Sequence, residues 1–492
     1  MVVADTPLSR RRSGVLLHPT SLPGGVGCGD LGTDAYRFVD FLAGSGMSVW
    51  QVLPLVPTHG DLSPYQGLSV HAGNPLLINL DRLQEWGWLQ AGTTDGVVDF
   101  EQHRRDQLQL AHQGFLQRAD DSVWAEYNHF VAEQSGWLED YALFQAIRQA
   151  QGHRHWLAWP DELRDRAPLA LAAMGKVLKD EVSCVRFEQF AFFRQWHQLR
   201  GYAHQRGVLL FGDLPIFVAH DSAEVWANRE LFLLDEHGQA QVVAGVPPDY
   251  FSATGQRWGN PYYNWARMQA DDFSWWKQRI GGQLAMFDWV RIDHFRGFEA
   301  YWEIPAHEAT AMNGRWVKAP GDELFEALHQ VFDPLPLVAE DLGIITAEVD
   351  ALRQKYHLPG MKIVQFAFGG DADNPYLPHH QTFDSVVYTG THDNDTTLGW
   401  YQSLPESVQQ HVQSYLGFPQ ESMPWPMIRS ALASVARLTI LPMQDLLGQG
   451  SEHRMNTPGT SDGNWRWRFE WAQLDEGLAP KLKQLMRLYG RG

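Results

Sequence analysis

The stretch from residue 289 to 293 reads Trp289-Val290-Arg291-Ile292-Asp293, a short apolar run that ends in an acid. Runs of this length, bounded by turn residues and followed by helical periodicity, indicate strands buried on both faces of a parallel sheet. The chain contains eight such runs: Val15–His18, Ser48–Leu55, Val208–Phe217, Met286–Ile292, Leu335–Ala339, Lys362–Ala367, Ser385–Tyr388 and Arg437–Leu441. Eight buried strands separated by helices predict an α/β fold of the (β/α)8 TIM-barrel class.

The spacing of these runs predicts large insertions. Residues 1–60 would start the barrel, 61–205 would be mainly an inserted helical subdomain, and 206–492 would complete the barrel. A loop-rich insertion at about 228–272 is rich in Pro, Gly and aromatic residues, which is typical of a lid or substrate rim. After the last run about fifty residues remain, too few for a C-terminal β-sandwich of roughly 100 residues.

Composition excludes several classes of partner. Lys and Arg total 39 against 58 Asp and Glu, a net charge of −19, which disfavours nucleic acid and anionic membrane surfaces. No apolar stretch is long enough for a transmembrane helix or a signal peptide, and two cysteines suit a reducing compartment, so we expect a cytoplasmic protein. The 21 Trp, 25 Phe and 15 Tyr residues suit core packing and also carbohydrate binding, because a sugar face packs on a flat ring.

Acidic residues follow four of the predicted strands. They are Asp213, Asp293, Glu340 and Asp393. In a parallel barrel the C-terminal ends of all strands converge on one mouth, where the active sites of this fold lie. A helix cap or a turn would explain any one of these acids alone, but four of them predict a catalytic group.

Converging carboxylates suit two kinds of chemistry: binding of a divalent metal, or cleavage of a glycosidic bond by an acid and a nucleophile. Arg291 favours the second, because it lies on the same strand face as Asp293, would hold that carboxylate ionised and would compete with a metal. Glu340 has no basic residue within five positions and follows an apolar run. Its pKa is therefore expected to be raised toward neutrality, as a proton donor requires.

A glycine-rich motif at Gly27–Gly32 matches the dinucleotide-binding pattern. Its context is wrong, because the preceding strand ends near His18 and the next strand lacks an acidic ribose ligand. We therefore set aside a nucleotide-binding function. No calcium-loop pattern occurs either, so we predict no metal and no organic cofactor.

The blocks around these acids resemble those of a known clan. Four blocks are similar to the conserved regions of the α-amylase clan: Gly212–Pro215, Arg291–His294, Glu340–Gly343 and Gly390–Asn394. Others resemble one branch of that clan, the amylomaltases or 4-α-glucanotransferases, also called disproportionating enzymes: His18–Pro23, Ser63–Gln66, Pro248–Phe251, Trp258–Pro261, Gln365–Phe368 and Arg454–Thr460. The resemblance extends from His18 to about Arg468.

The resemblance implies a double displacement on α-1,4-glucans and maltooligosaccharides. Asp293 would attack the anomeric carbon, Glu340 would protonate the leaving oxygen, and Asp393 would favour the transition state. The 4-hydroxyl of another glucan would then take the glycosyl group. The implied substrate-binding residues are Tyr65, Asp213, Asp249, Tyr250, Phe251, Gln256, Trp258, Arg291, Phe366, His392 and Asn464.

Three alternatives remain open at this point. The same carboxylates could serve a hydrolase with water as acceptor. The barrel could bind glucans without turnover, or it could be a metal-dependent lyase or isomerase. The sequence does not distinguish a monomer from a dimer.

Overall fold

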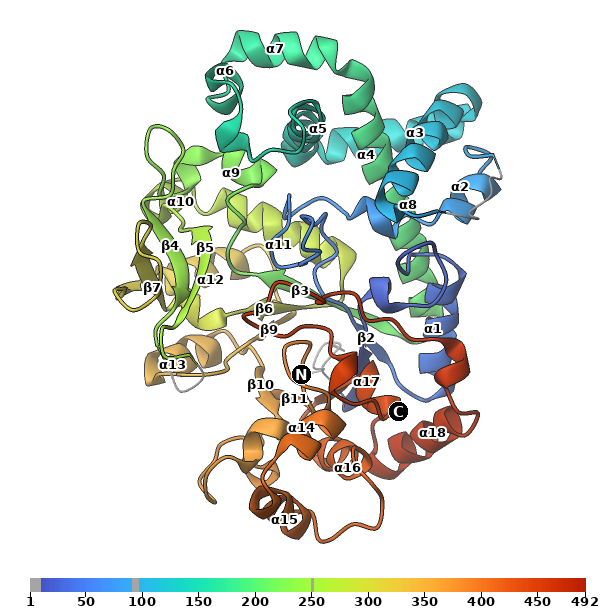
Figure 1. Ribbon diagram of the computed structural model, residues 1–492, viewed down its shortest axis with the longest axis vertical. Coiled ribbons are helices and arrows are strands. Elements are labelled where there is room, and N and C mark those ends of the chain that lie inside the picture. Colours follow the sequence, from blue (N-terminus) through green and yellow to red (C-terminus); the bar gives the residue numbers. More distant parts are fainter. Residues whose placement is uncertain (1–9, 91–96, 249–251) are drawn as a thin grey trace.

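The structure, a computed structural model, describes residues 10–90, 97–248 and 252–492 (Figure 1). At its centre eight parallel strands form one sheet in the order β10-β11-β12-β1-β2-β3-β6-β9. Their bounds are β1 Arg12–Leu16, β2 Val49–Gln51, β3 Leu209–Pro215, β6 Trp289–Asp293, β9 Leu337–Ala339, β10 Gly360–Ile363, β11 Ser385–Tyr388 and β12 Leu438–Pro442. Each of the eight predicted runs contains or overlaps one of these strands.

The sheet is nearly closed into a barrel, which confirms the predicted fold class. The seam lies between β9 and β10, where the Ala339 N–H donates a hydrogen bond of 2.8 Å to the Pro359 carbonyl. The observed start of β1 differs from the predicted one, because the strand begins at Arg12, before the apolar run Val15–His18. Gly14 lets β1 approach β2 there, because a Cβ atom at this position would collide with the Val49 carbonyl oxygen.

Helices cover the outside of the barrel, as the β/α alternation predicts. They include α1, α8, α11, α12, α13, α16 and α18, with bounds Thr33–Gly44, Lys179–Gln205, Ser274–Met286, Gly321–His329, Ala347–Lys355, Trp425–Ala433 and Leu478–Tyr489. One unit lacks an α-helix, because only two 3-10 turns, Val364–Phe368 and Pro378–His380, lie between β10 and β11. Helices α14 (Thr397–Ser403) and α15 (Glu406–Tyr415) follow β11.

The long connection between β2 and β3 is mostly helical among its described residues. It contains α2 Leu80–Glu85, α3 Phe100–Arg118, α4 Asp121–Glu133, α5 Ser135–Ala150, α6 Asp161–Arg164 and α7 Pro168–Val177, and it ends in α8. Helix α5 packs on α8 through a buried face that includes Trp137, Tyr141 and Phe144. In Figure 1 these helices form the upper part of the molecule.

A second, four-stranded antiparallel sheet lies beside the barrel mouth, at the left of Figure 1, and the sequence did not predict it. Its order is β5-β4-β7-β8, with bounds Gln256–Pro261, Val242–Val246, Ala300–Pro305 and Arg315–Lys318. Strands β4 and β5, with helices α9 (Ala223–Ala227) and α10 (Trp265–Ala270), occupy the stretch between β3 and α11. The stretch expected to be loop-rich therefore supplies half of a small sheet.

After β12 the chain contains α17 (Met443–Leu446), short 3-10 turns and α18, and it forms no β-sandwich in residues 443–492, all of which are described. Helix α18 packs against α1 and α16, so the C-terminal segment completes the helical layer.

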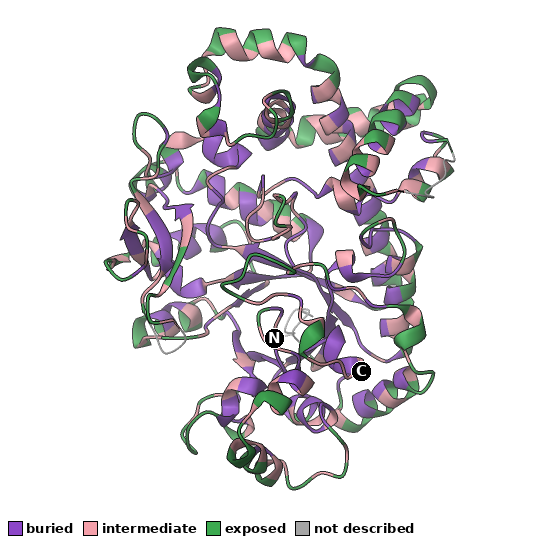
Figure 2. Ribbon diagram, viewed as in Figure 1, coloured by how far each residue is buried: buried purple, intermediate pink, exposed green. Residues whose placement is uncertain are grey.

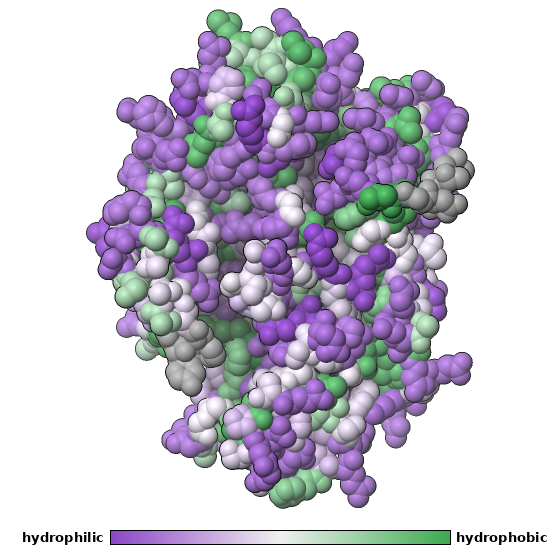
Figure 3. All heavy atoms as spheres, in the orientation of Figure 1, coloured by the Kyte–Doolittle hydropathy of each residue, from purple (hydrophilic) through white to green (hydrophobic). Residues whose placement is uncertain are grey.

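The pattern of buried residues follows the arrangement of the barrel. The barrel strands are almost entirely buried in Figure 2, and the outer helices expose one face. Helix α7 is an exception, because it buries none of its residues, and Figure 3 shows apolar side chains at the top of the molecule over this helix. Among the described residues no helix is both long and apolar enough to cross a membrane.

Candidate active site at the barrel mouth

The four predicted acids come together at the C-terminal ends of the barrel strands. Asp213 lies in β3 and pairs in register with Arg291 on β6, and Asp293 ends β6. Glu340 directly follows β9, and its N–H donates to the Ile292 carbonyl at 3.0 Å. Asp293 and Glu340 therefore occupy corresponding positions at the ends of adjacent strands, which are about 4.8 Å apart in a sheet.

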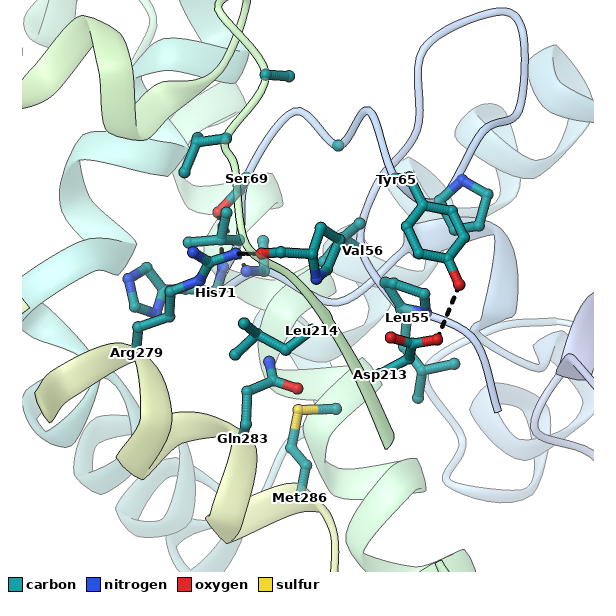
Figure 4. A pocket seen from close by; sticks show the side chains of 18 of the residues that line it. Leu55, Val56, Tyr65, Ser69, His71, Asp213, Leu214, Arg279, Gln283 and Met286 are labelled. Atoms are coloured by element: carbon teal, nitrogen blue, oxygen red, sulfur yellow. Dashed lines mark hydrogen bonds between the residues drawn. The ribbon is translucent and has the colours of Figure 1, made fainter. Parts of the chain in front are cut away.

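Arg291 joins two of the carboxylates. Its Nη1 donates to both carboxylate oxygens of Asp213 at 2.8 Å, and its Nη2 donates to Oδ1 of Asp293 at 2.8 Å. Arg291 and Asp213 are buried, with 5% and 2% of their surface exposed. The Tyr65 hydroxyl donates to Asp213 Oδ2 at 2.8 Å, and Figure 4 shows this bond at one end of a pocket that Arg279 and His71 line at the other.

The pKa of Asp293 is raised above its ordinary value. Desolvation in the mouth is the main cause, Arg291 opposes it, and the negative charges of Asp213 and Asp393 add to it. Arg291 thus favours the ionised form, as expected from sequence. The sequence argument missed that Arg291 shares its charge with Asp213 and that burial outweighs the remaining attraction.

Glu340 has different neighbours. Its carboxylate accepts hydrogen bonds from the main-chain N–H of His294 at 2.6 Å and of Leu342 at 3.3 Å. Desolvation raises the pKa of Glu340 to about 7, with Arg291 opposing this rise and Asp293 adding to it. The direction agrees with the expectation from sequence, and a carboxyl group with this pKa can donate a proton near neutral pH.

Asp393 lies in the loop after β11 and is half-exposed. Its Oδ1 accepts a hydrogen bond from Asn456 at 2.6 Å and lies 3.4 Å from His392 Nε2. Partial burial opposes ionisation, but the His392 charge and the hydrogen bonds from His392 and Asn456 outweigh it and hold the pKa of Asp393 below its ordinary value. Asp393 therefore stays negatively charged.

Aromatic rings connect the two sides of the mouth. The rings of Tyr65 and His392 are stacked with centroids 5.0 Å apart and an interplanar angle of 14°. Trp465, from the C-terminal segment, contacts both rings at 5.9 Å. One connected group of side chains therefore extends from Asp393 through Tyr65 and Asp213 to Asp293.

The other predicted residues lie around this group. Trp258, on β5, contacts the ring of His294 at 4.9 Å and donates from its indole to Gln256 Oε1 at 3.1 Å. Phe366 contacts Tyr376 in the turn after β10. The Asn464 amide stabilises the loop that contains it, because it accepts a hydrogen bond from the Thr457 N–H and donates one to the Thr460 carbonyl. Three further predicted residues, Asp249, Tyr250 and Phe251, lie outside the described residues.

No group of three or more His, Cys, Asp or Glu side chains within residues 10–90, 97–248 and 252–492 is arranged to hold a metal ion. At the mouth the position beside Asp213 and Asp293 is filled by the Arg291 guanidinium.

Comparison with known proteins gives the family. Residues 17–474 match the family model described as 4-alpha-glucanotransferase. The chain belongs to this family. A 4-alpha-glucanotransferase from a Synechocystis strain is 51% identical over 98% of this chain and 99% of its own length, and one from Thermus thermophilus is 48% identical over 96% and 98%. The structure of an amylomaltase from Streptococcus agalactiae in complex with acarbose has 38% identity and a TM-score of 0.94 and covers 98% of this chain.

Several residues of the candidate site could not be predicted from the sequence. Asn456 and Arg454 fix Asp393, the first through its carboxylate and the second through its carbonyl at 3.0 Å. Both lie in the quoted block Arg454–Thr460, but no spacing rule places that block beside a residue some sixty positions away. Arg279, fully buried on α11, holds the chain after β3 by donating to the Ile216 carbonyl at 3.1 Å.

Proposed function

We propose that the protein is a retaining 4-α-glucanotransferase that transfers α-1,4-glucan segments between glucans through a covalent glycosyl-aspartate intermediate. The proposal rests mainly on the observation that Asp293 and Glu340 lie at the ends of adjacent strands and have different partners. The Arg291 guanidinium contacts Asp293, and main-chain N–H groups contact Glu340. Adjacent carboxyl groups of this kind suit a retaining mechanism, which needs them about 5–5.5 Å apart. The names of the relatives support the same activity.

In the first step Asp293 attacks the anomeric carbon of the donor glucan and Glu340 protonates the departing glycosidic oxygen. Arg291 contacts Asp293 directly and favours its ionised form, which is the form that attacks. Glu340 keeps its proton up to about pH 7, because its pKa is raised to about 7. The bond to the leaving chain breaks as the bond to Asp293 forms, and the shortened chain departs as an alcohol.

In the second step Glu340, now a carboxylate, removes the proton of an acceptor hydroxyl, and this oxygen displaces Asp293 from the anomeric carbon. The product has the same anomeric configuration as the donor because two inversions have occurred. The His294 and Leu342 N–H groups stabilise the carboxylate form of Glu340 in the interval between the two steps.

The remaining side chains act on the donor sugar. Asp393 and His392 would accept and donate hydrogen bonds to its hydroxyl groups, and the permanent charge of Asp393 favours a positively charged, oxocarbenium-like transition state. Tyr65, braced by Asp213, offers a flat ring beside the sugar. Trp258, Gln256, Phe366 and Asn464 are proposed to line the acceptor side.

Transfer prevails over hydrolysis when an acceptor sugar is held in place and water is kept out. The small antiparallel sheet supports this preference, because it carries Trp258 against His294 beside Glu340. We also propose a cytoplasmic location, which agrees with two cysteines that are free and buried.

Incubation with maltotriose tests the proposed function. The account predicts longer maltooligosaccharides together with glucose, and loss of both products in a folded Asp293→Asn variant. Glucose and maltose without longer chains would instead show a hydrolase. No turnover by the unaltered protein would favour a glucan-binding protein, and loss of activity in a chelator would favour a metal-dependent enzyme.

A further inference from the structure

His294, the residue after the proposed nucleophile, has an uncommon backbone conformation. Its φ angle is +52°, in the left-handed region that side chains with a Cβ atom rarely adopt. Strained positions of this kind persist where the surrounding structure holds them, and they cluster at functional sites. Both the main chain and the ring of His294 make contacts with neighbouring residues.

The main chain of His294 makes a hydrogen bond to the proposed acid. In this turn the His294 main-chain N–H donates to Glu340 Oε2 at 2.6 Å. The next residue continues the contact, because the Phe295 N–H donates to the Glu340 carbonyl at 3.1 Å. The turn therefore holds both the carboxylate and the main chain of Glu340.

The His294 ring is packed against aromatic side chains. The ring meets Trp258 edge to face, with centroids 4.9 Å apart and an angle of 88°, and it lies 6.3 Å from the Phe217 ring. Gly297 leaves room for it, since a Cβ atom there would lie 3.3 Å from His294 Cδ2 and 2.8 Å from Ile216 Cδ1. Desolvation lowers the pKa of His294 to about 3, so the ring is neutral and its contacts do not change with pH in the working range.

We propose that His294 is a positioning residue for the transfer reaction. Its ring, held by Trp258 and Phe217, keeps a left-handed turn that aims the main-chain N–H at the carboxylate of Glu340. The inference rests on the proposed function, because it assigns Glu340 the role of acid and base. It adds a connection between β5 of the small sheet and the proton donor that follows β9.

The hydrogen bond from the His294 N–H determines in which direction the pKa of Glu340 should change in the variants. An N–H that donates to a carboxylate stabilises the ionised form and lowers its pKa, so weakening this bond raises the pKa of Glu340. The first step needs protonated Glu340, so activity falls as pH rises through that pKa. A higher pKa therefore moves the alkaline limb of the profile of kcat/KM against pH to higher pH. The other charged or titratable groups near Glu340 are Arg291, Asp293, Asp341 and Tyr376.

The test compares three variants, with maltotriose as substrate and glucose release as the readout across pH. His294→Val disfavours the left-handed turn, and we expect its alkaline limb to move up on the order of half a pH unit or more, with kcat/KM at least about tenfold lower. His294→Asn loses the ring contacts but tolerates the same turn and keeps the N–H, so its limb is expected to move less than that of His294→Val. If His294→Val does not fold, His294→Ala makes the same comparison.

His357 provides a matched control. It is also a histidine with a left-handed backbone, φ +56°, but it lies before β10, at the opposite end of the barrel from the mouth. We expect His357→Val to lower stability without moving the limb. The inference is overturned if the limb stays in place in His294→Val, or if it moves equally in His294→Asn or His357→Val. If the unaltered protein forms no longer chains from maltotriose, the proposed function fails first, whatever the variants do.

Discussion

Both sides of the barrel mouth carry carboxyl side chains, but the pKa values are shifted in opposite directions on the two sides. On the side of β6 and β9, the pKa values of Asp293 and Glu340 are raised, mainly by desolvation. On the side of β11, the pKa of Asp393 is lowered although partial burial opposes this, because His392 and Asn456 stabilise the charge. Burial therefore sets the direction of the pKa shift on one side of the mouth, and charged and hydrogen-bonding partners set it on the other.

This difference separates the roles of the acids. A group that protonates a leaving oxygen near neutral pH needs a raised pKa, and a group that stabilises a developing positive charge must stay ionised. At Asp293 the two influences compete, because Arg291 favours the ionised form while burial and the negative charge of Asp213 raise the pKa. The account is tested by changing the partners one at a time.

The largest effect is expected at the nucleophile itself. Asp293→Asn keeps the volume and removes the attacking carboxylate, so transfer from maltotriose should fall on the order of 10⁴-fold or more. Activity within tenfold of the unaltered protein would exclude Asp293 as the nucleophile. Circular dichroism controls for folding.

The loss of activity on removal of the acid Glu340 should depend on the leaving group of the donor. We expect Glu340→Gln to lower kcat on maltotriose by about 10²- to 10⁴-fold. With α-maltotriosyl fluoride as donor the loss in the first step should be much smaller, because fluoride leaves without a proton. Equal losses with both donors would contradict the assignment of Glu340 as the acid.

Arg291 holds two carboxylates at once, so its loss should affect both stability and pH dependence. Arg291→Met leaves Asp213 buried without its cation and is expected to lower the free energy of unfolding by about 3–5 kcal/mol, measured by urea denaturation. The loss of the cation also raises the pKa of Asp293, so the acidic limb of the profile of kcat/KM against pH should move to higher pH. An unmoved acidic limb in the folded variant would show that Arg291 does not act on the nucleophile.

The smallest effect is expected on the β11 side. Asn456→Ala removes one hydrogen bond from the half-exposed Asp393 and should lower kcat/KM by about tenfold while leaving the pH limbs in place. The unfolding free energy should change by less than about 1 kcal/mol, since the loop is near the surface. A larger effect on stability than on activity would give Asn456 a structural role.

Much of the barrel follows from local sequence. The strands are apolar on both faces, so runs such as Ser385–Tyr388 are visible without an alignment, and acids that follow them must share a mouth. The small sheet cannot be predicted in this way, because β5 is exposed at its start and buried at its end, β8 is mostly exposed, and neither shows a regular alternation of buried and exposed residues. Its strands depend on pairing between segments on either side of β6.

The candidate site could likewise be predicted only in part from the sequence. The acids and Arg291 could be chosen from their positions at strand ends, but contacts between distant segments could not. Asn456 reaches Asp393 across 63 positions, and the His294 N–H reaches Glu340 across 46. The direction of the Asp293 pKa shift also needed the structure, because it depends on how far Arg291 is shared with Asp213.

Mass spectrometry of a trapped intermediate tests the central claim most directly. The Glu340→Gln variant is incubated with α-maltotriosyl fluoride, which can form the glycosyl-enzyme but leaves no base to assist its breakdown. The account predicts a mass increase of one maltotriosyl group, located by proteolysis on the peptide that contains Asp293. A label on another carboxylate, or conversion of the fluoride to β-configured products without any labelled protein, would contradict it.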